Sequence, residues 1–143
     1  ARLFYPYGVG EARERLPSAL CQSLLRGIPF ELRCPTVRKD YVHVDDVALA
    51  LACLAASPDE GLFEIGTGLP VALGSLAQQL AARIGRPDLL ALGDEPDVLG
   101  AQVADARSLG ALGWRPLRPL DEGLDELVAH WMEQCCPPSP SGA

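Results

Sequence analysis

The segment Arg38-Lys39-Asp40 sets two cations directly before an acid, and a second acidic pair follows at Asp45-Asp46. Arginine and lysine are the side chains that bind phosphate groups, so the basic pair is a candidate anion site. Asp45 or Asp46 falls where a helix should begin, and a carboxylate there can cap free N–H groups. The simpler interpretation is an ordinary strand-to-helix joint whose charges are solvated.

The elements that must position these residues follow from the spacing of the apolar side chains. Helices are predicted near residues 14–26, 47–54, 73–84, 107–112 and 120–131, and short strands near residues 2–6, 30–33, 40–44, 62–65 and 88–92. Strands this short, placed between helices, do not suit a doubly wound sheet, whose strands are longer and more apolar. The sequence therefore predicts a mixed α/β domain of small size.

Several segments resemble one family. The stretch from Arg38 to Ala48 resembles R-D-(F/Y)-V-x-V-D-D-V-A of the extended short-chain dehydrogenase/reductases, which are NAD(P)-dependent nucleotide-sugar epimerases, dehydratases and ketoreductases. Residues 2–8 resemble R-x-F-N-x-Y-G, and residues 61–68 resemble G-x-(F/Y)-N-I-G-(S/T)-G. Residues 105–116 resemble D-x-(S/R)-(K/R)-L…L-G-W-x-P, and residues 120–131 resemble the family's closing helix. The motifs occur in the family's order.

The resemblance implies a domain organisation. The family's Gly-rich turn and its catalytic Tyr-x-x-x-Lys do not occur in this sequence. We therefore expect the small mixed α/β substrate-binding domain of an extended short-chain dehydrogenase/reductase, without the N-terminal Rossmann half. Residues 1–134 would form the C-terminal part, with the first strand belonging to the Rossmann sheet. The Pro- and Ser-rich residues 135–143 are predicted to be a disordered tail.

Site residues follow from the same resemblance. Leu3 and Phe4 would approach the nicotinamide of NAD or NADP, and Tyr5 replaces the Asn that touches the substrate. Leu16-Pro17 would lie beside the nucleotide base, and Arg38 or Lys39 would hold the diphosphate. The alternatives are a sheet-edge core for residues 3–5 and a plain helix entry for Leu16-Pro17.

Other polar residues receive lesser roles. Asp40 is expected to bond backbone N–H groups in a loop, and His43 is left without a catalytic role. Glu95 stands where the family has a second phosphate-binding Arg, and Arg83, Arg86 or Arg107 remain open as substitutes. No residue of this chain is predicted to be catalytic, and no metal site is predicted because the sequence holds no C-x-x-C.

Composition limits the partners. A net charge of −7 over 143 residues disfavours nucleic acid and anionic membranes, both of which attract basic surfaces. The sequence shows no signal peptide and no transmembrane run, so a cytoplasmic protein is expected. The five cysteines show no regular spacing, and Cys21 and Cys53 fall on apolar helical positions, where a thiol packs as a small hydrophobe.

Two functions follow. The leading hypothesis is the substrate-binding half of a nucleotide-sugar epimerase, dehydratase or ketoreductase, inactive by itself, with a nucleoside-diphosphate sugar, the missing Rossmann half and a second copy of the chain as partners. The alternative is a non-catalytic nucleotide-binding or protein-interaction module. An unpaired opening strand would also make the isolated chain marginally stable or prone to associate.

Overall fold

Short strands alternate with helices along the chain, as the apolar spacing predicted. The computed structural model describes residues 1–98 and 100–135. The strands are β1 (Arg2–Leu3), β2 (Tyr5–Tyr7), β3 (Phe30–Leu32), β4 (Arg38–Lys39), β5 (Tyr41–His43), β6 (Glu64–Ile65), β7 (Val71–Ala72) and β8 (Leu90–Leu92). The helices are α1 (Leu16–Leu25), α2 (Val44–Ala56), α3 (Leu73–Ile84), the 3₁₀ turn η1 (Pro87–Leu89), α4 (Arg107–Ala111) and α5 (Leu120–Cys135).

Each strand pairs with one that is distant in sequence. β1 runs parallel to β6, β2 parallel to β5, and β3 parallel to β8, whereas β4 and β7 are antiparallel. Within the described residues every sheet has two strands, which agrees with the prediction of a small mixed α/β domain. The pairing of β2 with β5 sets Tyr5 opposite Tyr41, and this register builds the floor of the candidate site.

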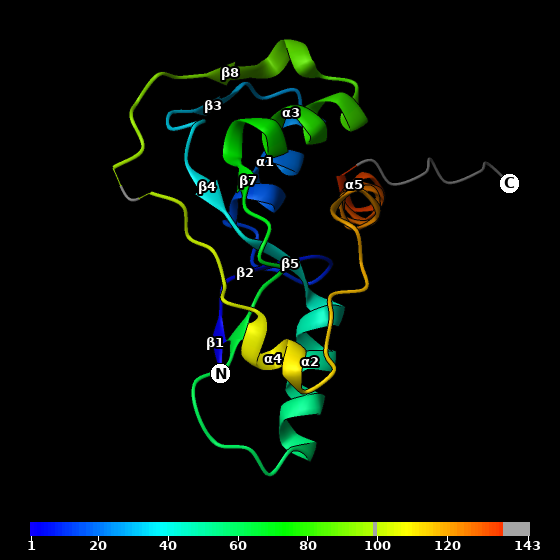
Figure 1. Cartoon of the computed structure of the whole chain (residues 1–143). Coiled ribbons are helices and arrows are strands. Elements are labelled where there is room, and N and C mark those ends of the chain that lie inside the picture. Colours follow the sequence, from blue (N-terminus) through cyan, green and yellow to red (C-terminus); the bar gives the residue numbers. More distant parts are fainter. Residues whose placement is uncertain (99, 136–143) are drawn as a thin grey trace, which may run out of the picture.

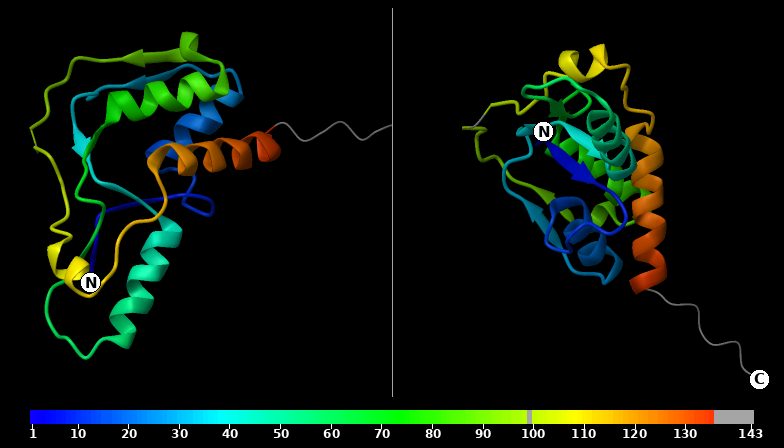
Figure 2. Two further views of the ribbon diagram at one scale, coloured as in Figure 1. Left: turned by 45° about the vertical axis from the view of Figure 1, so that its right-hand side comes forward. Right: turned by 90° about the horizontal axis from the view of Figure 1, so that it is seen from below.

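Two hydrophobic clusters hold together the helices and strands labelled in Figure 1. The larger one lies among α1, α3 and α5, where Leu24, Leu80 and Leu124 are fully buried. The smaller one lies where α2 and α4 meet β5 and β6, around Ile65 and Leu109. Figure 2 shows α2 extending away from the three-helix layer, so the chain has an upper and a lower lobe joined through β2 and β5.

Both tryptophans, Cys21 and Cys53 lie in or against these clusters. Trp114 and Trp131 are buried, and each indole N–H donates to an oxygen of the protein, at 3.2 Å to the Asp46 carbonyl and 3.0 Å to Ser18 Oγ respectively. Cys21 is also buried, which raises the pKa of its thiol to about 12. Cys53 is half-buried.

The opening segment differs in detail from the prediction. One strand was expected over residues 2–6, but the chain bends at Phe4 and forms β1 and β2, which pair inside the chain with β6 and β5. Along the other edge of β1, no strand is found among the described residues. That the first strand belongs to a Rossmann sheet stays a prediction.

Several elements differ from the prediction. Residues 40–44 were expected to form one strand, but β4 and β5 flank Asp40, and Val44 begins α2. The strand expected near residues 88–92 begins only at Leu90, after η1.

β7 was missed because it has only two residues between Pro70 and the start of α3, too few for an alternating pattern to be visible. α5 continues to Cys135, one residue into the predicted tail, while residues 136–143 lie outside the described part of the chain. Within the described residues, no helix combines the length and apolarity needed to cross a membrane.

Candidate functional site

A cavity of about 290 Å³ opens between α1, β2 and β4, and we call it the cation-lined cavity. Its walls are Tyr5, Arg15, Leu16, Pro17, Lys39, Tyr41 and Leu73. Four of the five residues expected to touch substrate, Tyr5, Leu16, Pro17 and Lys39, therefore come together on one cavity. They arrive from three separate segments, because β2 pairs with β5 next to β4 while α1 packs alongside.

Arg38 is the fifth expected residue, and the structure places it elsewhere. Successive side chains of a strand point to opposite faces, so Arg38 and Lys39 cannot both face the cavity from β4. The Arg38 guanidinium is exposed and donates a hydrogen bond of 3.0 Å to the Pro70 carbonyl. Lys39 therefore lines this cavity and Arg38 does not, while the contact of either cation with a diphosphate stays a prediction.

Lys39 is held by a polar cluster at the edge of the cavity. Its Nζ donates to Tyr5 Oη at 2.7 Å and to Gln102 Oε1, and Tyr5 Oη also donates to Gln102 Oε1. The ammonium lies 4.6 Å from the centre of the Tyr5 ring, within range of a cation–π contact. With two of its three N–H groups engaged, Lys39 keeps a fixed place and one donor for a ligand.

The expected cofactor residues lie on the other side of Tyr5. A second cavity of about 540 Å³, which we call the strand-end cavity, is lined by Arg2, Leu3, Phe4, Tyr5, Glu64, Ala101, Gln102 and Val103. Leu3 and Phe4 both line this cavity, and their approach to a nicotinamide stays a prediction. Tyr5 lines both cavities, so the two cavities meet at the Tyr5 side chain.

Asp40 braces the loops around the site. Its buried carboxylate accepts hydrogen bonds from the backbone N–H groups of Thr67 at 2.8 Å, Gly68 at 2.9 Å and Ala104 at 3.1 Å, and from the Thr67 hydroxyl at 2.6 Å. The predicted role of Asp40 is confirmed. A Cβ on Gly66 would lie 2.6 Å from Asp40 Oδ2, so this close approach requires glycine.

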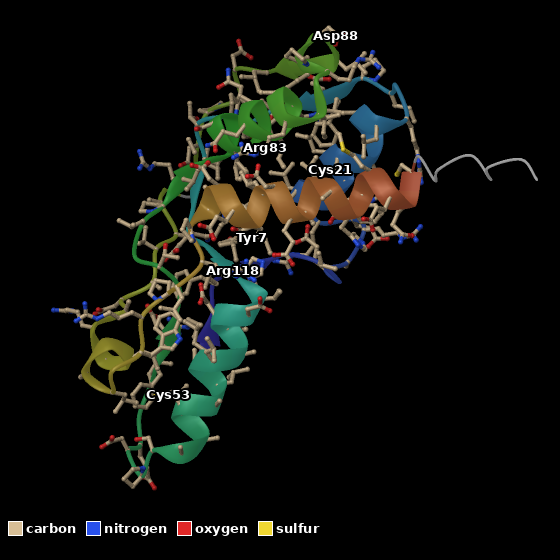
Figure 3. All side chains as sticks on the ribbon, turned by 90° about the vertical axis from the view of Figure 1, so that its right-hand side faces the viewer. Tyr7, Cys21, Cys53, Arg83, Asp88 and Arg118 are labelled. Carbon is tan, nitrogen blue, oxygen red and sulfur yellow. The ribbon has the colours of Figure 1, made fainter. Side chains whose placement is uncertain are left out.

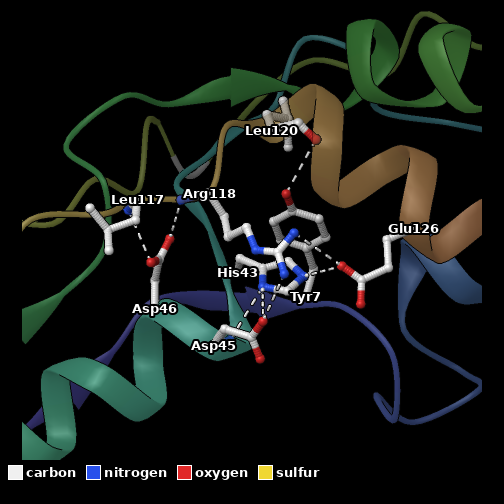
Figure 4. Close-up of polar contacts among 8 residues, drawn as sticks. All are labelled: Tyr7, His43, Asp45, Asp46, Leu117, Arg118, Leu120 and Glu126. Atoms are coloured by element: carbon white, nitrogen blue, oxygen red, sulfur yellow. Dashed lines mark hydrogen bonds and ion pairs between the residues drawn. The ribbon is translucent and has the colours of Figure 1, made fainter.

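The predicted cap of α2 was wrong (Figure 4). Helix α2 begins one residue before the acidic pair, and its cap is His43, whose buried Nδ1 accepts from the Asp45 N–H at 3.3 Å. The Asp46 carboxylate instead accepts from the backbone N–H groups of Leu117 at 2.9 Å and Arg118 at 3.0 Å. Asp45 pairs with the Arg118 guanidinium at 3.3 Å. These acids fasten the loop that leads to α5.

Four residues of the site were not singled out from the sequence: Arg15, Tyr41, Leu73 and Gln102. Arg15 directly precedes the Leu16-Pro17 pair, so its position in the sequence could have marked it as a site residue. Gln102 lies 63 positions from Lys39 and carried no sequence signal. Burial raises the pKa of Tyr41, and the Glu11 carboxylate adds to that rise, so the phenol stays neutral at physiological pH.

Glu95 and the three arginines left open as its substitutes lie away from both cavities. Glu95 accepts a hydrogen bond from Cys34 Sγ at 3.3 Å. Arg86 pairs with Asp88 at 3.1 Å and Arg107 with Asp105 at 2.5 Å. Arg83 of α3 reaches Asp121 at 3.0 Å and Asp125 at 2.6 Å on α5, so it links two helices. Figure 3 shows Arg83 and Asp88 on the upper lobe, which contains α1, α3 and α5.

Comparisons with known proteins agree with this architecture. No protein-family model matches the chain. It is 37% identical over 102 residues to the dTDP-L-rhamnose 4-epimerase of Burkholderia thailandensis, covering 68% of this chain and 28% of that protein. It is 25% identical over 134 residues to the dTDP-4-dehydro-6-deoxyglucose reductase of Escherichia coli, covering 89% of this chain and 42% of that protein.

A solved structure gives the same picture. MoeE5 in complex with UDP-glucose and NAD matches with a TM-score of 0.79 at 31% identity, over 93% of this chain and 46% of that chain. The two relatives are by name a nucleotide-sugar epimerase and a nucleotide-sugar reductase, and the matching solved structure is a complex with UDP-glucose and NAD. The chain belongs to the extended short-chain dehydrogenase/reductases, and it spans less than half the length of these relatives.

Proposed function

We propose that the chain is the substrate-binding half of an NAD(P)-dependent nucleotide-sugar epimerase, dehydratase or ketoreductase. The observation that carries this proposal is the convergence of Tyr5, Leu16, Pro17 and Lys39 on the cation-lined cavity. Lys39 would bind the diphosphate, while Leu16 and Pro17 would pack against the nucleotide base. The sugar would then extend toward Tyr5, where the two cavities meet.

The cofactor would reach the strand-end cavity. Leu3 is 44% exposed, and with Phe4 it offers an apolar wall that a nicotinamide ring could cover. When bound, NAD or NADP supplies the hydride chemistry, and the protein orients the reacting groups. In this proposal the residues of the chain bind and orient the sugar nucleotide, and the proton-transfer groups belong to the other half.

That other half would cover the lower lobe. From Val47 to Ala56, α2 carries no charged residue, yet Leu49 and Leu51 are 50% and 43% exposed. An uncharged, exposed helix face and an open strand edge at β1 are features that a second domain would bury. The proposal therefore expects the chain alone to bind nucleotides weakly and to catalyse nothing.

A dTDP-linked sugar is the proposed substrate class. Both curated relatives described above carry dTDP-linked sugars in their names, and the dTDP-4-dehydro-6-deoxyglucose reductase covers the larger part of this chain. Tyr5, where the family has Asn, narrows the meeting point of the cavities, which suits a sugar that lacks a hydroxyl. The competing proposal, a non-catalytic nucleotide-binding module, predicts the same binding but no turnover when the second half is supplied.

Calorimetric titration with dTDP and UDP tests the binding step. Replacing Lys39→Ala should weaken binding by about tenfold, because a charge-assisted hydrogen bond is lost. Arg38→Ala is the matched control, since it removes the same charge one residue away on the opposite face of β4 and should leave the affinity unchanged. Equal loss in both variants, or no binding by the unaltered chain, would contradict the proposal.

A further inference from the structure

The cation-lined cavity contains a second cation that the motif resemblance did not assign. Arg15 lies at the entry to α1 and lines the cavity together with Lys39. No acidic residue appears among the described residues that line it. In a chain of net charge −7, a concave site with two cations and no lining acid is a marked local reversal of charge.

In two other cavities the lining cation is paired with an acid at 3.3 Å or less. In the strand-end cavity, Arg2 pairs with Glu64 at 2.9 Å. A third, mainly apolar cavity of about 370 Å³ includes Arg118, which pairs with Asp45 at 3.3 Å and with Glu126 Oε2 at 3.6 Å. Of these three cavities, the cation-lined cavity is the one lined by two cations, and neither of them pairs with an acid closer than the 3.9 Å between Arg15 Nε and Glu11 Oε2.

Only one edge of the Arg15 guanidinium faces an acid within the described residues. Its Nε lies 3.9 Å from Glu11 Oε2, at the outer limit of an ion pair. The other carboxylate oxygen of Glu11 accepts from the backbone N–H of Ser18 at 3.0 Å and from its hydroxyl at 2.6 Å. The Arg15 side chain is 42% exposed, and its other guanidinium N–H groups can bind a ligand while Nε stays beside Glu11 Oε2, a buried oxygen without a hydrogen-bond partner among the described residues.

We infer that Arg15 is the second anion-binding residue of this site, acting with Lys39 on one diphosphate. The inference rests on the proposed function and deepens it, because two cations from different elements select a ligand with more than one phosphate. Lys39 supplies a fixed point charge, whereas the planar guanidinium of Arg15 can bind phosphate oxygens in a bidentate manner. A nucleoside monophosphate would engage both residues less completely.

Titration of dTDP and dTMP into the full chain tests this. Arg15→Ala should weaken dTDP binding by about tenfold and dTMP binding by less, and Arg15→Lys should recover part of the loss. The dependence of dTDP affinity on salt should also become shallower in Arg15→Ala, because one phosphate contact is removed. Arg26→Ala, at the other end of α1 and exposed, removes the same charge and should change neither ligand.

The outcomes separate the two proposals. If Lys39→Ala weakens dTDP binding and Arg15→Ala does not, the role of Arg15 is overturned while the proposed function stands. If Arg15→Ala weakens the binding of dTDP and of dTMP by the same factor, Arg15 is structural and the inference fails. The inference also fails if the variant melts low enough for part of the chain to be unfolded at the titration temperature and this accounts for the lost binding. If the unaltered chain binds neither nucleotide, the proposed function fails and the assignment of Arg15 with it.

Discussion

Lys39 and Tyr5 form one polar unit: Nζ donates to the phenol oxygen at 2.7 Å and lies 4.6 Å from the centre of the ring. The phenol in turn donates to Gln102 Oε1, which also accepts from Lys39. A cation that would otherwise move freely on a four-carbon stem is therefore held at the boundary between two cavities. This fixed position is what makes Lys39 a plausible partner for a ligand anion.

The phenol oxygen can be tested by Tyr5→Phe. This change keeps the ring but removes a hydrogen-bond acceptor from Lys39 and a donor to Gln102. We expect a loss of about 1 kcal/mol in the free energy of unfolding, typical for partly buried hydrogen bonds. Urea denaturation measures it. Tyr41→Phe is the control, since no hydrogen bond of its hydroxyl is found within the described residues, and a larger loss there would contradict the expectation.

Asp40 should be among the most sensitive positions of the chain. Asp40→Ala leaves three backbone N–H groups without their acceptor, at Thr67, Gly68 and Ala104. Unpaired buried donors are costly, so we expect a loss of about 3 kcal/mol or more in the free energy of unfolding. Asp94→Ala, an exposed acid, should change stability by less than about 0.5 kcal/mol. Similar effects at both positions would refute the bracing role.

Two glycines in helices give opposite predictions. A Cβ on Gly123 of α5 would lie 2.8 Å from Tyr7 Cζ and 2.9 Å from His43 Cδ2, so Gly123→Ala must displace a buried ring. We expect destabilisation by about 1–3 kcal/mol in a thermal or urea melt. Gly110 of α4 has open space at the same position. Gly110→Ala should stabilise by about 0.5–1 kcal/mol, because alanine favours the helix.

Glu11 should make stability depend on pH. Burial raises the pKa of its carboxyl above the ordinary value of 4.5, although Ser18 and Arg15 oppose the rise. The folded state therefore holds this proton more tightly than the unfolded state does. The resulting stabilisation is fully present below pH 4.5 and is lost as the pH rises through the folded pKa.

Glu11→Gln removes this titration, so its free energy of unfolding should fall less than that of the unaltered chain between pH 4.5 and neutrality. Urea melts across this pH range measure the difference. Glu14→Gln makes the same change of charge at an exposed neighbouring position and serves as the control. Parallel pH profiles for the unaltered chain and Glu11→Gln would show that burial does not perturb this carboxyl.

Local pattern was enough to predict much of this molecule. Apolar side chains at helical spacing placed α1, α3 and α5 within a few residues, because one face of each helix must be buried. The order of the motifs indicated the family. The sequence also predicted that Asp40 would bind loop N–H groups.

Only the tertiary structure decided which of these residues form a site. Lys39 and Gln102 meet across 63 positions, and Arg15 reaches the cavity of Lys39 because the entry to α1 borders it together with β2, β4 and β5. The cap of α2 passed to His43 for a similar reason, since the loop before α5 offered Asp46 two backbone N–H groups. Periodicity reports which face of an element is buried, whereas the partner that a side chain finds depends on how distant elements pack.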